Sequence, residues 1–169
     1  MPNYLGEFEA TLDSKGRIII PSGFKKQLPE VEGKRYVLCR GIDQYLLLYT
    51  ESQWEIRLQE IALLNDSNEE SAFLKRSLLN GATFVEPDSA GRIQLSKRML
   101  EYANITKDII FSAQITKQEI WDATTYDQHL QTQKEEVKAL NAKILGNRHL
   151  ISAAYGNTQA NPTKENTHD

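Results

Sequence analysis

The sequence contains one short stretch twice: residues 13–18 read DSKGRI, and residues 88–93 read DSAGRI. Five of the six positions are identical at a spacing of 75 residues. An internal repeat of this kind indicates a chain built from two related halves. We therefore interpret the rest of the sequence as two copies of one series of elements.

The similarity between the halves continues beyond the repeated hexapeptide. Ile20 matches Leu95 at the same spacing, and further on the spacing falls to 72, as though a loop had lost three residues. At this shorter spacing we align Val37 with Ile109, Leu48 with Ile120, Tyr49 with Trp121, and Trp54 with Tyr126. A half of about fifty residues buries too little surface for a core of its own. We expect the halves to fold together about a pseudo-two-fold axis, completing one barrel and leaving two related turns on the surface.

Local patterns in the first half predict mainly strands. Apolar and polar residues alternate over residues 7–12, which is the period of a half-buried strand. Residues 13–16 are typical of a turn, in which Asp accepts a hydrogen bond from the backbone two residues on and Gly adopts positive φ. The remaining elements expected here are a returning strand over 17–20, a short helix opened by Pro21 with Ser22 as its cap, and strands over 36–41 and 45–49.

Helix signals follow the strands of each half. Residues 50–53 resemble a capping box, which predicts a helix that ends near Asn65. A second helix is expected over 72–79, and an Asn-Gly pair stops it. In the second half, Thr124 and Thr125 introduce a longer helix that a glycine at position 146 ends. Its apolar residues share one stripe: Tyr126, Leu130, Val137, Leu140 and Ile144.

The composition argues against several classes of protein. Cys39 is the single cysteine, so no internal disulfide can form, and the three histidines are too far apart in sequence for a zinc site. No stretch approaches the ~18 apolar residues of a membrane span, and the first residues lack an export signal, so we expect a cytoplasmic protein. Ser14 and Ser89 have no histidine nearby, and no Gly-rich phosphate loop is present. We expect no catalysis, no cofactor and no metal.

Charge is distributed unevenly along the chain. The formal net charge of -3 argues mildly against an isolated subunit that binds a polyanion. Residues 51–70 carry six acids and one base, whereas residues 75–107 carry six bases and three acids. The acidic segment is either a solvated helix face away from DNA or a contact with basic residues of a neighbouring subunit. A basic face is compatible with the modest net charge.

The residues of the repeated turn carry different information. Turn chemistry alone explains Asp13, Gly16, Asp88 and Gly91. The two arginines of the repeat either pair with nearby carboxylates or bind phosphate and guanine, for which the planar guanidinium is well suited. Position 15 is a lysine, whereas the corresponding position 90 in the other copy is an alanine, so the first turn is the more cationic one.

Five motifs occur in a distinctive order and spacing: DSKGRIIIP, YLLLYTESQWE, FLKRSLLNGA, DSAGRI and IWDATTYDQ. They resemble the MraZ family of bacterial transcription regulators, and the resemblance covers roughly residues 4–144. That family has two SpoVT-AbrB-type domains, each with a D-x-x-x-R signature, here residues 13–17 and 88–92. The resemblance implies an α+β fold with a mainly β core, in which two swapped-hairpin halves form one pseudo-two-fold double-split β-barrel with flanking α-helices.

On this resemblance we expect five segments. They are a first SpoVT-AbrB-type domain over 7–54, a helical linker over 55–82, a second such domain over 83–126, a C-terminal helix over 127–150 and a disordered tail over 151–169. The tail prediction also rests on its Asn, Thr and Pro content and its lack of apolar periodicity.

The resemblance also implies double-stranded DNA as a partner. Residue by residue, the implied contacts fall on Lys15 and Arg17 in the first turn and on Arg92 in the second. Weaker candidates for phosphate contacts on the helices after the turns are Lys25, Lys26, Lys97 and Arg98. The second copy has Gln94 and Ser96 where the first has an isoleucine and a proline, so its returning strand is less apolar and its helix start less rigid.

A regulator of transcription is the function that these features predict. The resemblance implies a ring-shaped homo-oligomer that binds direct repeats upstream of its own division and cell-wall gene cluster, and we expect it to act as a repressor associated with the nucleoid. Avidity of many weak, salt-sensitive contacts would give the ring its affinity. The alternative is an AbrB-like antitoxin or oligomeric protein-interaction module, because a fold does not fix a function.

Overall fold

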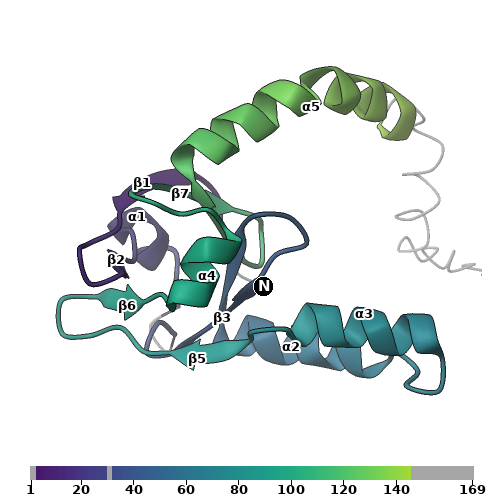
Figure 1. Ribbon diagram of the computed structural model, residues 1–169, viewed down its shortest axis with the longest axis horizontal. Coiled ribbons are helices and arrows are strands. Elements are labelled where there is room, and N and C mark those ends of the chain that lie inside the picture. Colours follow the sequence, from purple (N-terminus) through teal and green to yellow (C-terminus); the bar gives the residue numbers. More distant parts are fainter. Residues whose placement is uncertain (1–2, 30–31, 146–169) are drawn as a thin grey trace, which may run out of the picture. The chain divides into compact units, whose positions relative to one another are not determined.

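The computed structural model describes residues 3–29 and 32–145, which fall into two units (Figure 1). The first unit extends to Asp127 and the second begins at Gln128. The expected tail over 151–169, and the helix end expected at position 146, lie outside the described residues. The described residues of the first unit form eight strands: β1 (Glu7–Thr11), β2 (Arg17–Ile19), β3 (Tyr36–Arg40), β4 (Leu46–Thr50), β5 (Thr83–Val85), β6 (Arg92–Gln94), β7 (Asp108–Ala113) and β8 (Gln118–Asp122).

Helices lie between the strands of each half and after them. They are α1 (Ser22–Lys25), α2 (Glu51–Ala62), α3 (Glu69–Leu79), α4 (Lys97–Tyr102) and α5 (Ala123–Ile144). The two units divide within α5, so only its first five residues, 123–127, belong to the first unit. Each element up to α2 has a counterpart in the other half, and α5 is the counterpart of α2. Helix α3, the second helix of the α2–α3 hairpin, lies between the two copies in sequence. The mixed α+β class is confirmed.

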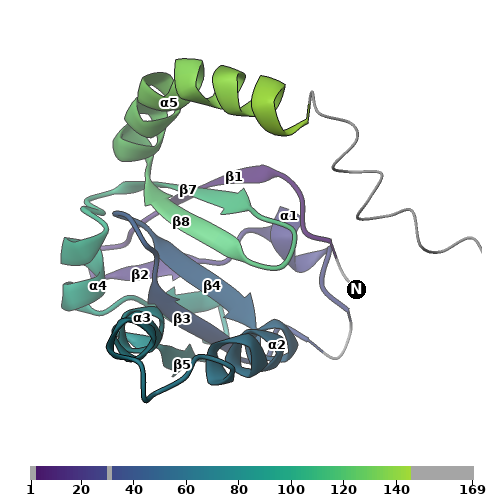
Figure 2. The same ribbon diagram turned by 90° about the vertical axis from the view of Figure 1, so that its right-hand side faces the viewer.

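The strand order shows that the halves are interleaved. Six antiparallel strands form one sheet in the order β1-β7-β8-β4-β3-β5, and β2 pairs with β6 in a second, two-stranded sheet. The counterparts are β1 and β5, β3 and β7, and β4 and β8. When each strand is exchanged for its counterpart, the large sheet keeps the same order, read from the opposite edge. Figure 2 shows β7, β8, β4 and β3 side by side. This is the pattern of a pseudo-two-fold axis, and the six-stranded ladder ends at β1 and β5.

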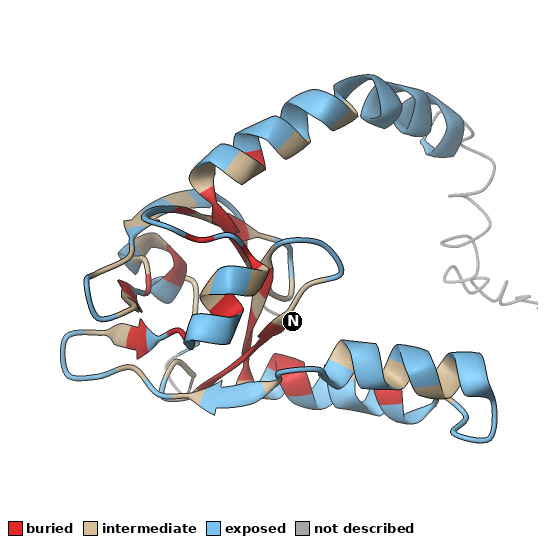
Figure 3. Ribbon diagram, in the orientation of Figure 1, coloured by how far each residue is buried: buried red, intermediate tan, exposed pale blue. Residues whose placement is uncertain are grey.

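The two halves share one hydrophobic core. Ile18 and Ile93 are partners in the β2–β6 pair, and both are fully buried. The main cluster also takes Leu38 and Leu48 from the first half and Phe111 from the second. In Figure 3 the buried residues concentrate on the strands, while α3 is exposed or intermediate along its length. Residues of both halves thus form one continuous core.

Helix starts differ from expectation at two positions. Ser22 is not a cap, since α1 has Pro21 at its N-cap and no side-chain cap bond. Ser96, expected to give a less rigid start, accepts a hydrogen bond from the Met99 amide and caps α4. Thr50 caps α2 as predicted, and this helix ends at Ala62, a few residues before the expected end.

The second helix of the hairpin begins earlier than its apolar residues suggest. We expected it from position 72, but α3 starts at Glu69 because the Asn68 side chain accepts a bond from the Ser71 amide. The two acids of its first turn, Glu69 and Glu70, complement the positive end of the helix dipole. The polar run before this helix therefore contains the cap.

One pair in the sequence alignment of the halves was wrong. Val37 pairs with Tyr49 in the first hairpin, and Ile110 pairs with Trp121 in the second. Because Tyr49 corresponds to Trp121, Val37 corresponds to Ile110 and not to Ile109. The reason is the turn between the strands, which has one residue fewer in the second half. A shift of one residue moves a side chain to the other face of a sheet. Accordingly, Val37 joins a second cluster on the outer face, while Ile109 is in the main core.

Candidate nucleic-acid interface

The two repeated turns have the same geometry. In the first, Oδ1 of Asp13 accepts hydrogen bonds from the backbone amides of Lys15 and Arg17, both at 2.9 Å. In the second, Oδ1 of Asp88 accepts from the amides of Ala90 at 2.9 Å and Arg92 at 3.0 Å. The glycine before each arginine has a φ of 75°, a conformation that favours glycine. The sequence DSxGR therefore closes the same tight turn twice.

Each signature arginine is held by the aspartate of its own turn. Nε of Arg17 donates to Oδ2 of Asp13, and Nε of Arg92 donates to Oδ2 of Asp88, both at 2.8 Å. A terminal nitrogen of Arg17 also lies 3.9 Å from Asp88 in the other turn. Carboxylate pairing, one of the two interpretations of these arginines, is thus present. The arginine side chains are nevertheless 24% and 32% exposed.

The turn aspartates remain ionised at neutral pH. Hydrogen bonds from the backbone amides of Arg17 and Arg92, ahead of their guanidinium contacts, lower the pKa of Asp13 and Asp88 below the usual 3.8. These two negative charges offset part of the positive charge of the arginines. The lysines around the turns therefore decide how cationic this surface is.

Pairing of β2 with β6 brings the two turns together. The Ile20 amide donates to the Gly91 carbonyl at 3.1 Å, and the Leu95 amide donates to the Gly16 carbonyl at 2.9 Å. Both turns project from the same side of the first unit, at the left in Figure 1, whereas the α2–α3 hairpin extends to the right. The acidic segment 51–70 belongs to that hairpin and is thus separated from the turns.

Helix α1 of the first half supplies a lysine to the turn of the second half. The ammonium of Lys25 lies 3.2 Å from the position that a Cβ on Gly91 would occupy. At the first turn, the matching position on Gly16 faces the side chains of Gln94 and Leu100 instead. By its position in the sequence, Lys25 was expected only on the helix after the first turn. The pseudo-two-fold axis was the signal that could have assigned it to the second.

Gln94 has a role that its sequence position did not suggest. Its side-chain amide donates to the carbonyls of Lys15 and Gly16 at 3.0 Å and of Leu95 at 3.1 Å. It therefore braces the first turn from the second half. Its counterpart Ile19 is 54% exposed and cannot make such bonds.

The other basic candidates are exposed near the start or end of the short helices. Lys15 is exposed at the tip of the first turn, and Lys26 at the end of α1. Lys97 and Arg98 are exposed in the first turn of α4, where Lys97 lies 3.7 Å from Glu101. Over residues 13–26 and 88–101 there are seven basic and three acidic side chains. This segment pair is positive although the chain carries a net charge of -3.

A family model matches each half of the chain separately. The family model described as "MraZ protein, putative antitoxin-like" matches residues 4–77 and again residues 78–147. The chain belongs to the MraZ family. Two MraZ relatives, each named transcriptional regulator MraZ, come from Cytophaga hutchinsonii and Christiangramia forsetii. They are 30% and 32% identical over 84% and 87% of this chain, and the matches cover 94% and 96% of the relatives.

A third MraZ relative is more similar over a shorter length. The transcriptional regulator MraZ of Caldanaerobacter subterraneus subsp. tengcongensis is 34% identical over 125 residues, which is 74% of this chain and 85% of the relative.

Among the described residues of this MraZ chain, no group of three or more His, Cys, Asp or Glu side chains is placed to hold a metal ion. None of the helices in residues 3–29 and 32–145 is long and apolar enough to cross a membrane.

Proposed function

We propose that this chain is a DNA-binding transcriptional regulator and not an enzyme, and that the paired turns are its DNA-binding surface. The observation that carries the proposal is the pairing of β2 with β6, which presents Arg17 and Arg92 on one face with a lysine beside each. Family membership and the names of the relatives support the same function.

The contacts divide into two kinds. Each arginine has its Nε held by the aspartate of its own turn, which restricts the position of its guanidinium. A fixed guanidinium suits bidentate recognition of guanine in the major groove. Lys15 and Lys25 are exposed point charges on long side chains beside the turns and suit phosphate. Lys26, Lys97 and Arg98 extend the phosphate surface along the two short helices.

We further propose that the protein is a cytoplasmic, nucleoid-associated repressor that binds direct repeats upstream of its own gene cluster as a ring. One face with two arginines and a few lysines provides a small set of contacts, which are weak and salt-sensitive alone. Several copies on one assembly raise the effective concentration of each face at neighbouring DNA repeats. An assembly bound across a promoter would block polymerase.

The interleaved strands and helix α5 support the architectural part of the proposal. The symmetric strand order, with β2 and β6 paired across the halves, is compatible with a swapped-hairpin double-split barrel. On α5, Leu130, Val137 and Ile144 are spaced by seven residues and are each more than half exposed, with Leu140 beside them. Apolar residues at this spacing form the seam of a coiled coil, so a second copy of the helix is a suitable partner.

Salt-dependent DNA binding tests the main proposal. Fluorescence anisotropy with labelled duplex from the region upstream of the gene would be measured at several salt concentrations. Lys15→Gln and Lys25→Gln are each expected to reduce the slope of log K against log salt by about 0.9. Arg17→Gln is expected to reduce discrimination against a scrambled duplex by about 1–3 kcal/mol. Circular dichroism melting would show that each variant is folded.

Arg76→Gln is the matched control. It also removes one positive charge, but from an exposed position on α3 in the acidic hairpin. Equal slopes for wild type, Lys15→Gln, Lys25→Gln and Arg76→Gln would exclude the turns as the DNA-binding surface. Light scattering of Leu140→Gln against wild type tests self-association separately, because this substitution leaves the turns unchanged.

A protein-interaction module is the second candidate, favoured by the antitoxin-like family description and by the exposed stripe of α5. The same two measurements separate it from the first. A folded chain with no salt-dependent affinity for its upstream DNA, and no self-association through α5, would favour the interaction module.

A further inference from the structure

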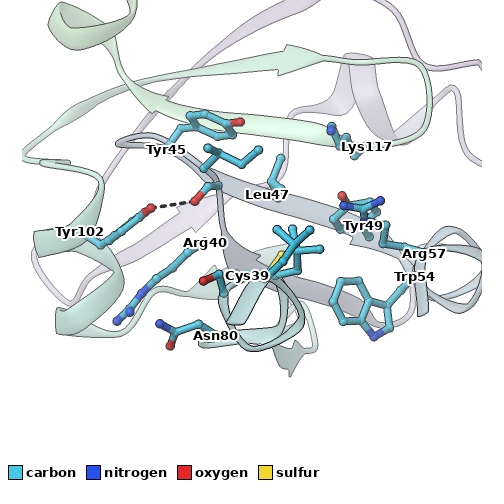
Figure 4. A pocket seen from close by; sticks show the side chains of 15 residues that line it. Cys39, Arg40, Tyr45, Leu47, Tyr49, Trp54, Arg57, Asn80, Tyr102 and Lys117 are labelled. Carbon is cyan, nitrogen blue, oxygen red and sulfur yellow. Dashed lines mark hydrogen bonds between the residues drawn. The ribbon is translucent and has the colours of Figure 1, made fainter. Parts of the chain in front are cut away.

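A cavity of about 400 Å³ lies on the outer face of the β3–β4 hairpin (Figure 4). Because side chains alternate along a strand, Leu38 and Leu48 enter the main core while Cys39, Leu47 and Tyr49 line the cavity. Helices α2 and α3 supply the apolar walls, Trp54, Leu74 and Leu78. The volume lies within the range of about 300–1,000 Å³ that small-molecule sites occupy.

The cavity is lined by three cationic side chains and no acid. Arg40, Arg57 and Lys117 are each half-buried. Among the described residues, Arg57 pairs with the exposed Glu60 at 2.7 Å, and no carboxylate lies within ion-pair distance of Arg40 or Lys117. A partly buried cation without a carboxylate partner loses hydration and gains little in return. An anion that enters the cavity would supply the missing partner.

Arg40 packs over an aromatic ring at one end of the cavity. Its guanidinium carbon lies 5.0 Å from the centre of the Tyr102 ring, and its buried Nε has no hydrogen-bond partner among the described residues. The Tyr102 hydroxyl donates to the Gly41 carbonyl at 2.7 Å, as Figure 4 shows, which fixes this end of the cavity. The Nε–H of Arg40 therefore lacks a hydrogen-bond acceptor among the described protein groups.

The cations lie at two ends of the cavity. In Figure 4, Arg57 and Lys117 lie near the Tyr49 ring at one end, and Arg40 lies beside Tyr102 at the other. Arg57, Lys117 and Tyr49 also line a smaller adjoining cavity of about 160 Å³. The end with two cations therefore has room for a head group, and the apolar surface lies between the two ends.

We propose that this cavity binds an amphipathic organic anion. Its carboxylate, sulfonate or phosphate head lies between Arg57 and Lys117, and its apolar body packs against Leu47, Trp54 and Leu74. A dianion would reach Arg40 with its second group. The site shares no residue with the paired turns, so this inference does not depend on the proposed function.

Two fluorescent probes with one skeleton test the charge requirement. The sulfonate 1-anilinonaphthalene-8-sulfonate combines an aromatic body with an anionic head, and N-phenyl-1-naphthylamine is the same molecule without the sulfonate. Titration of each probe into the full chain is expected to give one site with at least about tenfold higher affinity for the sulfonate, the effect of a charge-assisted contact. Equal affinities, or no binding of the sulfonate, would overturn the proposal.

Substitutions assign the site. Arg57→Gln and Lys117→Gln should each weaken sulfonate binding about tenfold and leave the neutral probe unchanged. Arg76→Gln, which removes an arginine outside the cavity, should change neither. If Arg57→Gln, Lys117→Gln and Arg76→Gln bind the sulfonate equally, the anion site is not in this cavity. Melting temperature would be compared for all three.

A filling substitution separates this cavity from other apolar surfaces. Leu74 is 46% exposed, so Leu74→Trp can be folded while its larger side chain occupies the cavity mouth. Both probes should lose affinity in this variant. Unchanged binding would place the probes elsewhere and refute the assignment. Refutation would also follow if wild type bound neither probe and Leu74→Trp changed the oligomeric mass, since a second copy would then cover the cavity.

Discussion

Substituting the central pair of the small sheet tests whether the halves are one cooperative unit. Ile18 and Ile93 are directly opposite each other in β2 and β6, and both are fully buried. Truncating a fully buried isoleucine to alanine costs about 2–5 kcal/mol, through lost burial and the cavity left behind. Because both side chains enter the shared core, we expect Ile18→Ala and Ile93→Ala to destabilise the whole first unit by similar amounts.

Ile19 provides a matched control in the same strand. It is the same residue type, adjacent in sequence and 54% exposed, so Ile19→Ala should change the free energy of unfolding by less than about 0.5 kcal/mol. Urea unfolding followed by tryptophan fluorescence and by circular dichroism would measure all three variants. We expect one transition, coincident for both probes, in each variant. Separate transitions, with Ile18→Ala affecting one and Ile93→Ala the other, would refute a shared core.

Additivity provides the second part of this test. Side chains in contact couple by about 0.5–3 kcal/mol in double-mutant cycles. The milder Ile18→Val and Ile93→Val variants, about 0.5–1.5 kcal/mol each, allow the double variant to remain folded. Strict additivity in this cycle would mean that the two side chains do not contact each other.

Three further predictions concern local chemistry. The pKa of Asp13 and of Asp88 is lowered below the usual 3.8, so their ionised pairing with the arginines stabilises the fold above that pH. This stabilisation is lost as the pH falls through the lowered pKa values. The double Asp→Asn variant should therefore show a shallower decline in melting temperature below pH 4. Burial raises the pKa of Cys39 to about 12, so a thiol reagent at pH 8 should modify it far more slowly in the folded chain than after denaturation. Ser96→Ala should cost about 1 kcal/mol in urea unfolding, whereas Ser22→Ala, which removes no cap bond, should be near neutral.

Sequence reasoning predicted the elements whose signals are local. Alternation over residues 7–12 predicts β1, and the Asp-x-x-Gly pattern predicts a turn, because each depends only on neighbouring residues. The cap at Thr50 is likewise local and is confirmed. The start of α3 was missed although Asn68 is a good cap residue, since its first turn is entirely polar and gives no apolar periodicity.

Features that depend on pairing between the halves could not be read in this way. The alignment of Val37 with Ile109 failed because one turn is a residue shorter, and only the register of both hairpins reveals it. The outer cavity is a stronger example. Its cations come from β3, α2 and the β7–β8 turn, so no stretch of sequence brings Arg40, Arg57 and Lys117 together.

The contacts between the halves also change how the two copies of the repeat compare. Taken alone, the first copy has Lys15 where the second has Ala90, which made the first turn the more cationic. In the folded chain each turn is completed by the helix of the other half, and this contributes Lys25 to the second turn but Leu100 to the first. Each turn therefore has one arginine and one lysine. The asymmetry that remains is structural, because Gln94 braces only the first turn. For the DNA proposal this means that Lys15→Gln and Lys25→Gln should reduce the salt slope equally.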